Sequence, residues 1–146
     1  MQEAEEFDLG AALGAEETFS VQKIVIYLPD RDRKNEPVPD IEDYVQAAMI
    51  TLLDINTGVT RLPPAYGKFK DSDTGIVAHE NTHLVYSFVM DSSAFESRVV
   101  EITDFIRDFG KKTNQKSVMV EFSGEIPDPD GGIGKYFCRA YSIKKF

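Results

Sequence analysis

Both histidines of the chain fall within one five-residue segment, His79-Glu80-Asn81-Thr82-His83. On a helix, HExxH spacing places two imidazoles one turn apart on the same face, where they bind zinc, and the Glu between them acts as general base on the metal-bound water. The segment is the one complete catalytic pattern in this sequence. It would make His79 and His83 metal ligands and Glu80 the catalytic base.

The residues around this segment, IVAHENTHLV, resemble the active-site helix of thermolysin-like zinc metallopeptidases. The resemblance implies a third metal ligand, a Glu supplied by the following helix. Glu101 lies on the next predicted helix at about the required spacing. Under this alternative the chain is a minimal zinc metallopeptidase, with zinc as its cofactor.

The local pattern favours a strand over a helix at the same place. From His83 onward, Leu84, Tyr86, Phe88 and Met90 alternate with the residues between them, which is strand periodicity. On a helix, Asn81 would lie in the middle of the face away from the metal, where an unpaired amide is costly. We therefore prefer a hairpin, with strands over 75–79 and 83–90 joined by a loop over 80–82, and keep the zinc helix as the alternative.

The elements that must position this segment follow from patterning elsewhere in the chain. Helical spacing of apolar residues predicts one helix from the N-cap Asp40 to near Asn56, and another from the N-cap Ser93 to Gly110. Strands are predicted over 19–28, 117–123 and 135–143, and the proline-containing stretch 60–70 is expected to be extended or looped. The order β-α-β-β-α-β with an extra C-terminal strand predicts an α+β, ferredoxin-like fold, an antiparallel sheet with two helices on one face.

Length and charge restrict the class of protein. The 146 residues fit a single domain, and one Cys cannot form an internal disulfide. The formal net charge is −9, and residues 1–19 hold six acidic side chains and no basic one. We therefore expect a flexible acidic arm over 1–18 and one α+β domain over 19–146, cytoplasmic in location. An acidic chain without a long apolar run is expected to bind neither nucleic acid directly nor a membrane.

Several short motifs, taken in order, resemble a family of short uncharacterised bacterial and phage-borne α+β proteins. The resemblance covers about residues 21–122 and leaves both ends of the chain outside. It implies that Glu80 lies at a strand, and it supplies a fold but no activity. The matching motifs are Ile26-Tyr27-Leu28-Pro29, Gly58-Val59-Thr60, Gly67-Lys68-Phe69, Glu80 and Gln115-Lys116-Ser117-Val118.

A cluster of aromatic and basic residues is the remaining candidate site. Tyr66, Lys68, Phe69 and Lys70 follow Pro63-Pro64 and could contact an anionic ligand or a nucleotide. The alternative is that their aromatic rings simply cover the end of the sheet.

The sequence thus favours a non-enzymatic binding module without a cofactor. Its expected partner is a protein or a small anionic ligand, for which it would serve as an inhibitor or sequestering factor. We expect it to be a homo-oligomer, because exposed strand edges and oppositely charged chain ends favour self-association.

Overall fold

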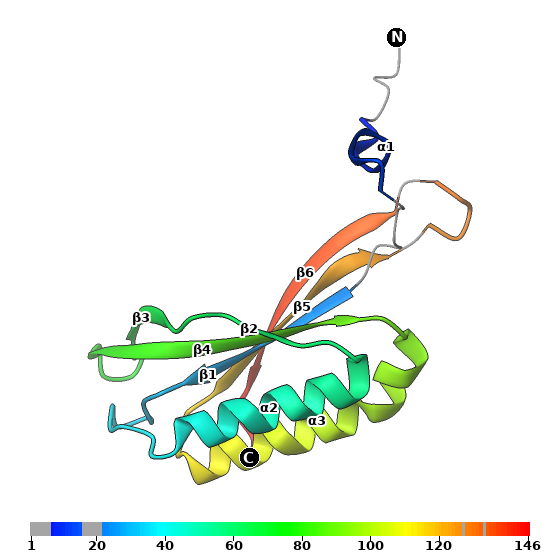
Figure 1. Cartoon of the computed structure of the whole chain (residues 1–146). Coiled ribbons are helices and arrows are strands. Elements are labelled where there is room, and N and C mark those ends of the chain that lie inside the picture. The colour runs from blue at the N-terminus through cyan, green and yellow to red at the C-terminus, as the bar shows by residue number, and fades with distance from the viewer. Residues whose placement is uncertain (1–6, 16–21, 127, 133) are drawn as a thin grey trace.

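The computed structural model describes residues 7–15, 22–126, 128–132 and 134–146. Figure 1 shows one twisted sheet with the two long helices lying side by side against one of its faces. The elements, in chain order, are α1 (Leu9–Leu13), β1 (Gln22–Pro29), α2 (Ile41–Asn56), β2 (Thr60–Arg61), β3 (Ala65–Lys70), β4 (Val77–Val89), α3 (Ser92–Lys112), β5 (Val118–Ile126) and β6 (Lys135–Ile143).

The sheet has six strands and is antiparallel throughout. Its order is β2-β4-β1-β5-β6, and β3 also pairs with β4. The central path β3-β4-β1-β5, with α2 and α3 on one face, is the ferredoxin-like arrangement. The predicted fold is therefore confirmed, and β6 extends it at the β5 edge.

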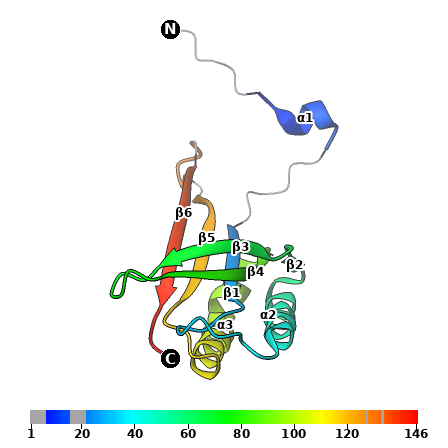
Figure 2. The same ribbon diagram turned by 90° about the vertical axis from the view of Figure 1, so that its left-hand side faces the viewer.

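The core lies between the sheet and the two long helices. Strand alternation sends Ile24, Ile26 and Leu28 of β1 toward the helices, because successive side chains point to opposite faces. From the helices, Leu52 of α2 and Phe109 of α3 are completely buried against them. Within the described part of the chain, no long helix covers the opposite face of the sheet, and this leaves its side chains free to form a site (Figure 2).

The two helix starts differ in detail from the predictions. Asp40 precedes α2 as expected, but it adopts a left-handed backbone conformation and its side chain makes no capping bond. At α3 the cap is Asp91, whose carboxylate accepts the Ala94 N–H at 3.1 Å, so Ser93 lies inside the helix. Carboxylates and hydroxyls cap equally well, which is why the sequence alone does not choose between these neighbours.

The predicted hairpin through 80–82 is wrong. The segment lies within the continuous strand β4, and the turn falls between β3 and β4, where Gly75 has φ +71°. The stretch 60–70, expected as extended or looped, forms β2 and β3, with Pro63 and Pro64 between them. Asn81 fits a strand because its N–H and C=O both bond to Asp30, at 2.9 Å and 3.0 Å.

Half of the predicted acidic arm, residues 1–6 and 16–18, lies outside the described residues. Within it, α1 begins after Asp8, whose side chain accepts the Ala11 N–H, and none of its residues is buried. The first residues of the strand predicted over 19–28 also lie outside the described ranges. Among the described residues, no helix combines the length and the apolar character needed to cross a bilayer.

Candidate functional site

A cavity of about 380 Å³ opens on the face of the sheet away from α2 and α3. The same alternation that buries Ile26 and Leu28 directs Tyr27 and Pro29 of β1 to this opposite face. The loop after β1, the turn between β3 and β4, and the loop before β5 complete the wall. The lining residues are Tyr27, Pro29, Asp32, Arg33, Phe69, Lys70, Asp71, Ser72, Ala78, Glu80, Thr82, Gln115, Lys116, Ser117, Met119 and Ser142.

Glu80 is the carboxylate that projects from β4 into this cavity. Its side chain is half-buried, and burial raises its pKa because the charged form loses hydration. The Thr82 hydroxyl donates a 3.1 Å hydrogen bond to Glu80 Oε1, which opposes the rise, while the charge of Asp30 adds to it. Such a carboxylate is poorly solvated and attracts a cationic ligand group more strongly than a surface carboxylate does.

Tyr27 stands on the neighbouring strand and lines the same cavity. Its hydroxyl donates a 2.7 Å hydrogen bond to Glu121 Oε1 of β5. Burial, and then this bond to an anion, raise the pKa of Tyr27 to about 12. The ring is therefore a neutral, fixed surface at neutral pH, suited to contact with an apolar or aromatic ligand group.

An ion-pair cluster lies at the edge of the cavity. Lys116, from the loop before β5, places Nζ 2.9 Å from Asp73 Oδ2 and 3.4 Å from Asp71 Oδ2. The other carboxylate oxygen of Asp71 accepts the N–H groups of Asp73 and Thr74, and these two bonds hold the pKa of Asp71 below its usual value. The cluster therefore joins the β3–β4 turn to the loop that follows α3.

The aromatic and basic residues predicted as a ligand site belong only in part to the cavity wall. Phe69 and Lys70 line the cavity, whereas Tyr66 and Lys68 are not part of its wall. Tyr66 instead bonds through its hydroxyl to Nδ1 of His79, which is also exposed. Only half of the predicted cluster therefore belongs to this site.

The zinc helix is not formed. In a strand, His79 and His83 are four residues apart and so lie about 13 Å from each other, too far to share one metal ion. Nδ1 of His83 lies 3.2 Å from Nη2 of Arg61, and Glu101 is bound by Arg98 at 2.6 Å. Among the described residues no three potential ligands gather around a common point. The metallopeptidase alternative is therefore wrong, and Glu80 faces away from both histidines.

Comparison with known proteins adds a likeness in fold. The structure of a phage SAM lyase in complex with S-methyl-5'-thioadenosine matches at a TM-score of 0.57 and 18% identity, over 85% of this chain and 89% of that chain. The structure of a phage SAM lyase in the apo state matches at a TM-score of 0.56 and 16% identity, over 90% of this chain and 98% of that chain. No family model matches the sequence, and no curated protein matches it.

This likeness corrects the functional expectation. The non-enzymatic binding module is contradicted, because both similar proteins are lyases. The α+β fold that the family resemblance implied is confirmed, and the similar structures are phage proteins. Sequence reasoning also missed Tyr27 and Lys116 as site residues, although both lie in the IYLP and QKSV motifs that carried the resemblance.

Proposed function

We propose that this chain cleaves S-adenosylmethionine (SAM) without adding water and releases S-methyl-5'-thioadenosine. The observation that carries the proposal is the half-buried Glu80 carboxylate in a cavity on the open face of the sheet. Its support from outside the chain is the fold it shares with phage SAM lyases, one of which holds S-methyl-5'-thioadenosine. The cavity volume, about 380 Å³, falls within the range of small-molecule sites.

The chemistry follows from the sulfonium group of SAM. S-Methyl-5'-thioadenosine is the neutral thioether that remains when the bond between sulfur and Cγ of the amino acid chain breaks and its electron pair goes to sulfur. In a lyase reaction, an oxygen of the substrate's own carboxylate attacks Cγ as the C–S bond breaks. The new C–O bond closes a five-membered lactone. The positive charge on sulfur and the negative charge on the carboxylate disappear together, so no proton needs to be transferred.

The residues of the cavity suit the two ends of such a molecule differently. Glu80 attracts the sulfonium and selects it over a neutral thioether. Tyr27, Phe69 and Met119 provide the apolar and aromatic surface that an adenosine group requires. A poorly hydrated site also favours a step in which two charges cancel, because water stabilises the separated charges more than the neutral product groups.

The test is to incubate the purified chain with SAM and measure both products by mass spectrometry, against SAM alone in matched buffer. We expect S-methyl-5'-thioadenosine and homoserine lactone in equal amounts. In water enriched in heavy oxygen, later opening of the lactone puts the label in the carboxyl group, whereas direct hydrolysis puts it in the hydroxyl group. Absence of thioadenosine above the control, or label in the hydroxyl group, would overturn the proposal.

A further inference from the structure

The cluster of Lys116, Asp71 and Asp73 is a pair of opposite charges placed at the edge of a binding cavity. Asp71 and Lys116 both belong to the cavity wall, and they come from loops far apart in the chain. Their separation of 3.4 Å is long for an ion pair, and Lys116 is shared with the more exposed Asp73. Neither charge is therefore fully neutralised by the other, and each side chain can also bind a ligand group of opposite charge.

The chemical complement of this arrangement is an α-amino acid head group. Such a group carries an ammonium and a carboxylate on adjacent positions of one carbon. A lysine and an aspartate side by side offer the opposite charge to each. In the bound state, the ammonium lies against Asp71 and the carboxylate against Lys116, so that each charged group of the ligand meets a side chain of opposite sign.

We infer that Lys116 and Asp71 bind the amino acid end of the substrate, whereas Glu80 and the aromatic wall bind its sulfonium and adenosine parts. The inference rests on the function proposed above and makes it more specific, since it names the groups that separate SAM from ligands without an amino acid end. Asp71 is suited to this role because its other oxygen is already fixed by two backbone N–H groups, at 2.7 Å and 3.1 Å. A fixed acceptor loses little further freedom on binding.

This placement is compatible with lactone closure. One carboxylate oxygen of the substrate accepts a bond from Lys116, and the other keeps a free electron pair for attack on Cγ. When the new C–O bond forms and the C–S bond breaks, the oxygen held by Lys116 becomes the carbonyl oxygen of the lactone. Lys116 neither gives up nor receives a proton, so its role is to position the chain.

Two ligands that differ only in the amino acid part test the inference. S-Adenosylhomocysteine has the head group but no sulfonium, and S-methyl-5'-thioadenosine lacks the head group. Their dissociation constants are measured by isothermal titration calorimetry on the full chain and on Lys116→Met, Lys116→Arg and Asp71→Asn. We expect Lys116→Met and Asp71→Asn to weaken S-adenosylhomocysteine binding about tenfold or more, and Lys116→Arg to weaken it less. Binding of S-methyl-5'-thioadenosine should change less than about twofold in all three.

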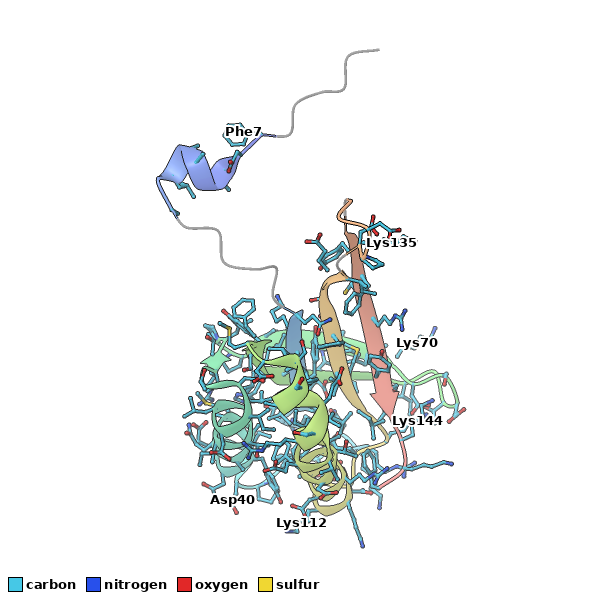
Figure 3. All side chains as sticks on the ribbon, turned by 90° about the vertical axis from the view of Figure 1, so that its right-hand side faces the viewer. Phe7, Asp40, Lys70, Lys112, Lys135 and Lys144 are labelled. Carbon is cyan, nitrogen blue, oxygen red and sulfur yellow. The ribbon has the colours of Figure 1, made fainter. Side chains whose placement is uncertain are left out.

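Lys112→Met is the matched control. Lys112 forms a comparable ion pair with Asp108, 3.0 Å apart, but it lies near the end of α3, away from Lys70 at the cavity (Figure 3). Its removal should leave both dissociation constants unchanged. Asp71→Asn keeps an oxygen that accepts the same backbone bonds, so the turn should persist.

The outcomes separate the inference from the proposed function. If Lys116→Met leaves S-adenosylhomocysteine binding unchanged, or weakens both ligands equally, the head-group assignment is wrong even when the chain cleaves SAM. If the chain binds S-adenosylhomocysteine in a Lys116-dependent way but releases no thioadenosine, the assignment holds and the lyase proposal fails.

Discussion

Replacing Glu80 by Gln removes the negative charge that β4 contributes to the cavity and keeps the size of the side chain. Under the proposed function, Glu80 attracts the sulfonium of SAM before the bond breaks, and this attraction fades as sulfur becomes neutral. The substitution should therefore weaken substrate binding more than it slows the chemical step. We expect KM to rise while kcat does not fall, because an interaction stronger in the ground state than in the transition state contributes to affinity and not to rate.

The size of the effect follows from the position of the carboxylate. Two unit charges about 4 Å apart attract each other by about 4 kcal/mol at an effective dielectric constant of about 20. Glu80 is half-buried and open to water on one side, so we take about half of that value, about 2 kcal/mol. A tenfold change corresponds to about 1.4 kcal/mol, and KM should thus rise about 30-fold.

The assay is the rate of S-methyl-5'-thioadenosine release over a range of SAM concentrations and pH. In the unaltered chain, KM should fall as pH rises through the pKa of Glu80, which burial places above the usual carboxyl value. Glu80→Gln should lack this step. Glu96→Gln, an exposed position on α3, is the control and should match the unaltered chain.

Stability provides a check on folding for the same variant. Because the pKa of Glu80 is raised in the folded state, its ionisation disfavours folding, and this penalty is present above the folded pKa and absent at low pH. Glu80→Gln should therefore unfold at a higher temperature than the parent near neutral pH, with the gain lost in acid. A 30-fold fall in kcat with KM unchanged would refute the role assigned to Glu80.

Four further predictions concern the fold around the site. Leu52→Ala should lower the free energy of unfolding in urea by about 2–5 kcal/mol because Leu52 is completely buried, whereas Leu53→Ala at the exposed neighbouring position should cost less than about 0.5 kcal/mol. Tyr27→Phe removes a part-buried hydrogen bond to a carboxylate and should cost about 1 kcal/mol in the same assay; unchanged stability would show that the bond contributes nothing. Glu42, whose pKa its Arg partner lowers to about 2, should stabilise the fold above its unfolded pKa of 4.5. The difference in Tm between the parent and Glu42→Gln should then close as pH falls toward about 2, and a difference independent of pH would contradict it. Deletion of residues 1–18 should leave Tm unchanged, since no residue of α1 is buried, and a large loss would show that the arm belongs to the domain.

The order of elements could be predicted because it depends on local patterns. Helical spacing over 41–56 reports which face of that helix is apolar, and the apolar run of β1 indicates a buried strand. Two such helices with antiparallel strands have few ways to form one core. The position of the turn in the β3–β4 hairpin could not be predicted in the same way. Pro63 and Pro64 leave a loop over 60–70 as reasonable as a strand, and Asn81 is as suited to a turn as to a strand until Asp30 bonds to its backbone.

The sequence by itself determined the ferredoxin-like sheet and the two helices that cover one face, because periodicity is a property of neighbouring residues. Only the tertiary structure decided what the chemically active residues can do. His79 and His83 are close in sequence yet about 13 Å apart along β4, so the zinc pattern has no site. Glu80 lies between them but faces the opposite side, where strand pairing brings it to the cavity that Tyr27, Asp71 and Lys116 also line. The alternation of β4 thus places Glu80 on the face opposite to the two histidines that flank it in sequence. The pairing of the strands brings Glu80 together with residues that are distant in sequence.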